Sequence, residues 1–106
     1  MIGRVDGETI LFSPEEILYI EKVDGRTFAY TVDRVVQVDL SLSTAELILE
    51  DVSFFRCSKS MIVNINKVKR LKSLSSNRID ATLINGEHVM ISRTYASCFR
   101  KLLRGE

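Results

Sequence analysis

The sequence holds few of the residues from which catalytic and metal centres are built. His88 is the only histidine, and the two cysteines, Cys57 and Cys98, lie 41 positions apart without forming a metal-type pair. That spacing argues against a zinc site and against a disulfide framework. A glycine-rich loop of the phosphate-cradling kind is also missing. These absences argue against an enzyme, and we expect neither a cofactor nor a metal ion.

Long apolar runs are missing as well. No segment approaches the roughly 20 apolar residues that span a bilayer, and no basic stretch followed by an apolar region opens the chain. We therefore expect a cytoplasmic protein with no membrane partner. The chain has 106 residues, of which 45% are hydrophobic and 27% are charged. These values predict that residues 1–106 form a single globular domain with a core of its own.

Turn signals divide the chain into short runs. Asp6-Gly7, Asp24-Gly25 and Asn85-Gly86 each separate apolar or alternating stretches, which strongly indicates β-hairpins. Ser75-Ser76-Asn77 predicts a further turn. Many short strands with few helices predict a mainly antiparallel β protein. The expected strands cover residues 2–5, 8–12, 18–23, 27–32, 35–39, 61–65, 67–74, 78–84 and 87–91.

One short helical turn and two helices are expected between and after these strands. The only proline, Pro14, follows Ser13, and this pair predicts the helical turn. Ser43 and Glu46 have the spacing of a capping box, which predicts a helix over 45–50.

The second helix is expected to begin near Ser92, a good N-cap, and to stop at Gly105. We expect Cys98, inside this helix, to be a small core residue. The apolar face of the helix is predicted to consist of Tyr95, Phe99, Leu102 and Leu103.

The segment from Phe54 to Asn64 is the most informative part of the chain. Two aromatic residues lead into Arg56, Cys57, Ser58, Lys59 and Ser60, and an apolar run follows. We expect residues 56–60 to lie at the rim where two strands meet, because the flanks fit a half-buried sheet. Their cations and hydroxyls can donate hydrogen bonds to phosphate oxygens. The alternative is an ordinary solvated loop. Cys57 either packs in the core or, beside Arg56 and near Lys59, is an oxidisable thiol with a lowered pKa.

Charge is distributed unevenly along the chain, although the formal net charge is only +1. Residues 1–53 carry four cations and eleven acids, a net charge of −7, whereas residues 54–106 carry eleven cations and three acids, a net charge of +8. Such asymmetry between halves indicates a polyanionic partner. A fold that interleaved the two halves would weaken this indication.

Three blocks of residues together resemble a known family. They are Ile17-Leu18-Tyr19-Ile20-Glu21, the segment Phe54 to Asn64, and Ile91-Ser92-Arg93-Thr94-Tyr95 after the hairpin at Asn85-Gly86. In this order and spacing they resemble the LytTR DNA-binding domain, an output module of bacterial response regulators. The resemblance implies an elongated antiparallel β-β-β sandwich of short sheets with one or two short helices. It also implies loops that enter successive major grooves of double-stranded DNA, and a promoter site of two direct repeats bent by two copies of the protein.

The resemblance also implies roles for individual residues in DNA recognition. Base reading is expected from three loops, and Arg is the commonest side chain to read guanine in the major groove. The expected base readers are Arg26, with Thr27 instead if the first loop shifts by one residue, Lys59 and Arg93. The expected phosphate contacts are Arg56, Ser58, Ser60, Lys67 and Ser92.

Other interpretations of these residues remain open at this point. Arg26 can be an ordinary hairpin cation and Lys59 a solvated loop charge. The whole chain can instead be a β-rich protein-interaction or dimerisation module without DNA binding. If it is the C-terminal part of a longer regulator, the resemblance implies a receiver domain before residue 1.

Overall fold

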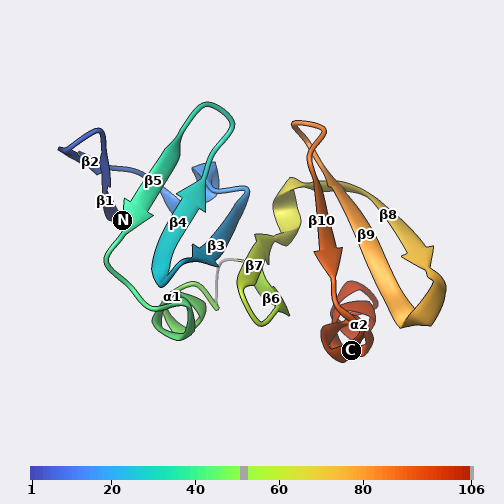
Figure 1. Cartoon of the computed structure of the whole chain (residues 1–106). Coiled ribbons are helices and arrows are strands. Elements are labelled where there is room, and N and C mark those ends of the chain that lie inside the picture. The colour runs from blue at the N-terminus through green and yellow to red at the C-terminus, as the bar shows by residue number, and fades with distance from the viewer. Residues whose placement is uncertain (51–52, 106) are drawn as a thin grey trace.

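The computed structural model describes residues 1–50 and 53–105 (Figure 1). The strands are β1 (Ile2–Val5), β2 (Glu8–Leu11), β3 (Tyr19–Val23), β4 (Arg26–Tyr30), β5 (Val35–Val38), β6 (Phe54–Ser58), β7 (Met61–Asn64), β8 (Val68–Leu74), β9 (Arg78–Leu83) and β10 (His88–Ile91). The helices are α1 (Leu42–Ile48) and α2 (Arg93–Leu103), and the short 3-10 helices are η1 (Pro14–Glu16), η2 (Ile65–Lys67) and η3 (Ser75–Asn77).

Tight turns set the register of the hairpins. The Asp24-Gly25 turn joins β3 to β4, and both of its residues have positive φ angles, 51° and 77°. This backbone matches the right-handed twist of the flanking strands, and Asp-Gly adopts it readily. The hairpins predicted at Asp6-Gly7, Asp24-Gly25 and Asn85-Gly86 are therefore confirmed, since they join β1 to β2, β3 to β4 and β9 to β10.

The strands form two antiparallel sheets. The larger has seven strands in the order β2-β1-β5-β4-β3-β7-β6, and the smaller has three in the order β10-β9-β8. The β1–β2 hairpin joins the larger sheet through one register pair, Arg4 with Gln37. The molecule measures 42 × 26 × 25 Å along its principal axes. The predicted elongated, mainly antiparallel β fold with two short helices is thus confirmed.

Two hydrophobic clusters lie on opposite faces of β3 and β7. Ile20 and Ile62 pack with α1 on one face, whereas Tyr19 and Val63 pack with the smaller sheet and α2 on the other. Neighbouring residues of a strand point to opposite faces, so each of these two strands contributes to both clusters. The result is a layered arrangement in which β3 and β7 hold the two ends of the molecule together.

Helix α1 begins three residues earlier than the sequence predicts. Its N-cap is Ser41, whose Oγ accepts a hydrogen bond from the Thr44 backbone N at 3.0 Å. The predicted capping box of Ser43 and Glu46 is therefore wrong, and the helix spans Leu42–Ile48 rather than 45–50. A helix that begins after Ser41 buries Leu42 and Ala45 in the core. This burial explains why Ser41 rather than Ser43 is the N-cap.

Helix α2 follows its predicted range but not its predicted face. Its N-cap is Ser92, and Gly105 follows with φ at 76°, as expected. Phe99 is fully buried, but Leu102 and Leu103 are half exposed, at 47% each. Cys98 is exposed, so its predicted core position is wrong. Among the described residues, no helix is long and apolar enough to cross a membrane.

Candidate nucleic-acid interface

The turn between β6 and β7 is the centre of the candidate interface. Lys59 and Ser60 form this turn, and both are exposed. The Ser60 backbone N donates to Ser58 Oγ at 3.2 Å, which closes the turn. The strands expected from the sequence do not include residues 54–58, whereas β6 covers Phe54–Ser58 and so reaches into the predicted rim at residues 56–60. The pairing of β6 with β7 lengthens the strand, so only Lys59 and Ser60 remain outside the sheet.

A β-bulge at Cys57 connects this turn to the start of α2. The register shifts between Arg56 and Ser58, so Cys57 has no partner on β7. Its carbonyl oxygen instead accepts a hydrogen bond from the Ser92 backbone N at 2.8 Å. A bulge redirects the groups around it, and here it fixes Ser92, and with it Arg93, beside the β6–β7 turn.

Burial also decides the role of the Cys57 thiol. Cys57 is fully buried, and desolvation raises the pKa of its thiol to about 12. The interpretation of Cys57 as an oxidisable thiol with a lowered pKa is therefore wrong. Arg56 does act in the lowering direction, but desolvation of the thiolate outweighs it.

The β3–β4 turn reaches the same place from the other half of the chain. The Lys22 backbone N donates to the Ser60 carbonyl at 2.8 Å, so the tip of this hairpin lies against the β6–β7 turn. Arg26 at the tip is exposed, whereas Thr27 is only 5% exposed. The alternative that places Thr27 at the surface is contradicted, because Thr27 shares the inward face of β4 with Ala29.

These contacts gather three loops on one side of the molecule. In Figure 1 the β3–β4 turn, the β6–β7 turn and the β10–α2 junction all lie on the lower side of the view. The side therefore presents Arg26, Lys59 and Arg93, which are all exposed, together with Ser60. Side chains far apart in the sequence are thus brought onto one surface by two backbone hydrogen bonds to the segment 57–60.

Lys67 does not belong to this surface. It ends η2, which follows β7, and its carbonyl accepts from the Ile84 backbone N near the β9–β10 turn. Strand β7 has four residues, which at a rise of about 3.3 Å each puts Lys67 roughly 13 Å or more from the β6–β7 turn. Figure 1 shows η2 and the β9–β10 turn on the upper side of the view. The structure therefore separates Lys67 from the other expected phosphate contacts.

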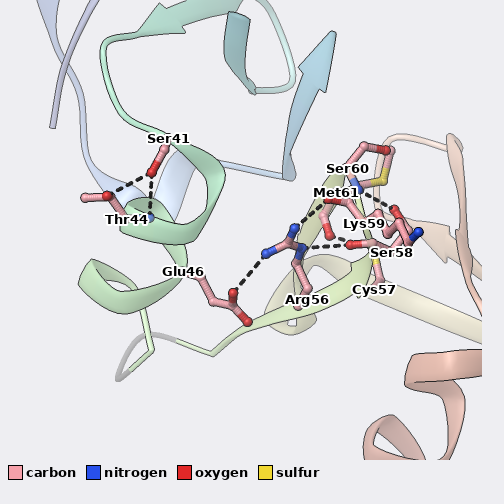
Figure 2. Close-up of polar contacts among 9 residues, drawn as sticks. All are labelled: Ser41, Thr44, Glu46, Arg56, Cys57, Ser58, Lys59, Ser60 and Met61. Carbon is pink, nitrogen blue, oxygen red and sulfur yellow. Dashed lines mark hydrogen bonds and ion pairs between the residues drawn. The ribbon is translucent and has the colours of Figure 1, made fainter. Parts of the chain in front are cut away.

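Arg56 turns its guanidinium inward along the protein, as Figure 2 shows. Its Nε donates to the Ser58 carbonyl at 2.7 Å, and its Nη2 donates to the Lys59 carbonyl. Its Nη1 donates to Glu46 Oε1 at 3.0 Å. Arg56 thus contacts the backbone of the turn that it was expected to flank, and only 17% of its side chain is exposed.

The start of α2 combines a half-buried hydroxyl with an exposed cation. Ser92 caps the helix through its backbone geometry, and its side chain makes no capping hydrogen bond within the described part of the chain. Arg93 stands in the first turn, where the helix dipole disfavours a positive charge. An anion at this position would accept from the Ser92 hydroxyl and neutralise Arg93.

The charged halves of the sequence are separated in space. Strands β1 to β5 and α1 occupy one end of the molecule, and the smaller sheet with α2 occupies the other (Figure 1). The fold therefore keeps the acidic and basic halves largely apart, and they meet where β3 pairs with β7 and where Glu46 of α1 contacts Arg56 of β6, among other places. Asp51 and Glu106, which contribute to the charge of each half, lie outside the described residues.

Lys22 is a candidate that no pattern in the sequence indicates. It belongs to the acidic half, yet its backbone touches Ser60, and its exposed side chain borders the β3–β4 turn. Together with Arg26 and Ser41 it lines a hollow of about 410 Å³ beside the β3–β4 turn and the segment that joins β5 to α1. Only the long-range contact of β3 with the β6–β7 turn reveals this position, so no local signal in the sequence could have found it.

Other polar groups of the chain lie elsewhere. Lys69, Arg70 and Lys72 are exposed on β8, the edge strand of the smaller sheet, where Lys also discourages pairing with other chains. The Nδ1 of His88 lies 2.9 Å from Asp80 Oδ2 on the same sheet. Across residues 1–50 and 53–105, no three His, Cys, Asp or Glu side chains are grouped to hold a metal ion.

Known proteins with similar sequences and structures are regulators and their domains. The sensory transduction protein LytT of Bacillus cereus is 31% identical over 100 residues, which are 94% of this chain and 41% of that protein. The transcriptional regulatory protein YpdB of Escherichia coli (strain K12) is 29% identical over 104 residues, 96% of this chain and 43% of that protein. A solved LytTr DNA-binding domain from Bacillus cereus matches with a TM-score of 0.92 at 31% identity, over 97% of this chain and 94% of that one.

The chain spans about two fifths of the length of the curated relatives it matches. The LytTr DNA-binding domain family itself matches residues 7–104, which is almost the whole sequence. Similarity of this extent, in sequence and in fold, assigns the domain. The chain belongs to the LytTr DNA-binding domain family.

Proposed function

We propose that this domain binds double-stranded DNA in a sequence-specific manner and regulates transcription. The observation that carries the proposal is the convergence of three exposed cations, Arg26, Lys59 and Arg93, on loops joined by backbone hydrogen bonds. Loops held in this way can enter a groove without a large loss of conformational entropy, since the protein has already fixed them. Arg93, at the start of α2, is the principal base reader in this proposal.

The remaining side chains of the surface take supporting roles. Lys59 and Arg26 read further base edges, and Arg bonds guanine through two parallel hydrogen bonds, whereas Lys acts as a point charge. Ser58, Ser60 and Ser92 offer hydroxyls to phosphates, and such contacts fix the register of a protein on the duplex. Lys22 joins them as a phosphate contact, and Lys67 and Thr27 have no part in the proposal.

Two copies of the domain bind a promoter site made of direct repeats. The repeats place successive major grooves on one side of the duplex about one helical turn apart. Because the curated relatives are more than twice as long as the matched region, we further propose that the domain serves as the output module of a response regulator with a receiver domain before it. Phosphorylation of that receiver would then control how two copies meet on the DNA.

Selection of bound oligonucleotides from a random pool, followed by titration of the selected duplex, tests the proposal. Neutralising about six phosphates makes the logarithm of the affinity fall steeply with the logarithm of the salt concentration, by about 0.9 per phosphate. An interaction module without DNA binding would enrich no motif, and its apolar contacts would change little with salt. A pool that yields no motif at low salt would therefore refute the proposed function.

A further inference from the structure

The contact between Glu46 and Arg56 links α1 to the β6–β7 turn. Glu46 Oε1 accepts from Arg56 Nη1 at 3.0 Å, and the two residues lie on different elements of the larger sheet and its helix. Glu46 keeps 44% of its side chain exposed, whereas Arg56 keeps 17%. Figure 2 shows the guanidinium lying between the carboxylate on one side and the turn on the other.

The guanidinium holds two consecutive carbonyl groups of the turn. Arg56 donates from Nε to the Ser58 carbonyl and from Nη2 to the Lys59 carbonyl. A guanidinium is planar and presents its donors in a fixed fork, so these two carbonyls must face the same side of the turn. The peptide planes on both sides of Lys59 are thereby set, and with them the direction in which the Lys59 side chain leaves the backbone.

Glu46 fixes the guanidinium in turn. Helix α1 is anchored by the cap at Ser41 and by the buried residues Leu42 and Ala45, so its backbone offers Glu46 a rigid base. A hydrogen bond between two charged groups is stronger than one between neutral groups. The carboxylate therefore selects the rotamer in which Arg56 reaches the turn.

The sign of the charge on Glu46 makes this role distinctive. A carboxylate close to a DNA-binding surface repels phosphates, so it lowers affinity unless it contributes in another way. Here the Glu46 carboxylate is paired with Nη1 of Arg56. The other two guanidinium nitrogen atoms of Arg56 donate to the Ser58 and Lys59 carbonyls. Arg56 is therefore built into the turn rather than extended toward solvent.

We propose that Glu46 and Arg56 are positioning residues, which hold the β6–β7 turn in the conformation that directs Lys59 at the DNA. This proposal rests on the proposed function, because it concerns how the same surface reads its site. It assigns Arg56 a structural role in recognition instead of a direct phosphate contact. It also makes Glu46, an acid, a residue that strengthens specific DNA binding.

The variant Glu46→Gln separates positioning from simple electrostatics, because the two effects have opposite signs. Loss of one negative charge alone tightens binding to every duplex. Loss of positioning weakens binding to the selected site, by about tenfold if one charge-assisted hydrogen bond is lost, and leaves a scrambled duplex unaffected. Glu8→Gln is the matched control, since Glu8 is exposed on β2 at the far end of the molecule. Fluorescence anisotropy with both duplexes measures the six affinities of the wild type and the two variants.

Arg56→Lys is the second variant, because it keeps the charge and loses the fork. Positioning predicts a similar loss on the selected site, an unchanged salt dependence, and no additional loss in the double variant with Glu46→Gln. If Arg56→Lys bound like the wild type while Arg56→Ala reduced the salt slope by about 0.9, Arg56 would be a phosphate contact and the proposal would be wrong. Thermal melts identify any variant that fails to fold.

A readout on the free protein keeps this test independent of DNA binding. The backbone amide shifts of Lys59 and Ser60, measured by NMR, should move in Glu46→Gln and stay in place in Glu8→Gln. Unmoved turn amides would overturn the positioning role even if the wild type bound DNA well. If instead the wild type selected no motif but the turn amides moved, the proposed function would fail while the link between α1 and the turn would stand.

Discussion

Replacement of Arg93 by alanine should damage recognition without damaging the fold. Arg93 is exposed in the first turn of α2, and its side chain makes no hydrogen bond or ion pair with the residues that the structure describes. Its removal leaves no buried group unsatisfied, so the effect on stability should stay within about 0.5 kcal/mol. The change can even stabilise the domain slightly, because a cation at a helix N-terminus is unfavourable by about 0.3–1 kcal/mol.

Binding should respond in the opposite direction. A bidentate contact between Arg and guanine contributes about 1–3 kcal/mol of discrimination, so affinity for the selected site should fall roughly 5- to 150-fold. Preference at a single base pair should relax, while the other positions of the motif keep theirs. Repeating the oligonucleotide selection with Arg93→Ala, next to thermal melts of both proteins, measures the two effects.

A control variant that loses the same charge as Arg93→Ala completes this experiment. Lys69→Ala removes one cation from the exposed strand β8, on the basic half but away from the three loops. It should leave the selected motif unchanged and alter affinity only through long-range electrostatics. A folded Arg93→Ala protein that selected the wild-type motif with wild-type affinity would refute the role of Arg93 as a base reader and the convergence argument with it.

Further outcomes follow from the placement of individual side chains. Lys22→Ala should make the slope of log affinity against log salt concentration shallower by about 0.9, whereas Lys67→Ala should leave that slope unchanged. The same slope in both variants would contradict the placement of Lys22 inside and Lys67 outside the candidate interface. A thiol reagent at neutral pH should modify the exposed Cys98 rapidly and Cys57 only on unfolding, because burial raises the pKa of the Cys57 thiol to about 12. Rapid modification of both cysteines would show that the core around Cys57 is accessible in the folded protein. Asn64→Ala should destabilise the domain by about 1–3 kcal/mol in chemical denaturation, since it leaves the Ile17 carbonyl, 2.9 Å from Asn64 Nδ2, without that buried donor. Insertion of about five base pairs between two repeats should abolish paired binding in gel shifts while single-site binding survives, and undiminished pairing would exclude the one-sided geometry.

Local features of the sequence determined the hairpins, the second helix and the family. Asp-Gly and Asn-Gly turns depend on the backbone preferences of two adjacent residues. Ser92 and Gly105 mark helix ends through their own backbone conformations, extended at Ser92 and with positive φ at Gly105. Such signals need no distant partner, so they can be recognised before the fold is known. The three blocks that resemble the LytTR family carried the same information, and the family match confirmed it. A local hydrogen bond also ends β7, since the Asn64 side chain accepts from the Asn66 backbone N at 3.1 Å.

Only the tertiary structure decided which of the expected contacts share a surface. Arg56, Ser58 and Lys59 are neighbours in sequence, yet a bulge and the pairing of β6 with β7 turn Arg56 toward Glu46 and leave Lys59 exposed. The pairing of the strands also removes Lys67 from the candidate interface and adds Lys22 to it. Lys67 lies beyond the far end of β7, whereas the Lys22 backbone N donates to the Ser60 carbonyl, 38 positions away in the sequence. Hydrogen bonds between distant backbone groups depend on the packing of whole sheets, and no local pattern records them. The sequence therefore indicated the kinds of side chain in the candidate interface, and the pairing of the sheets decided which of them share one surface.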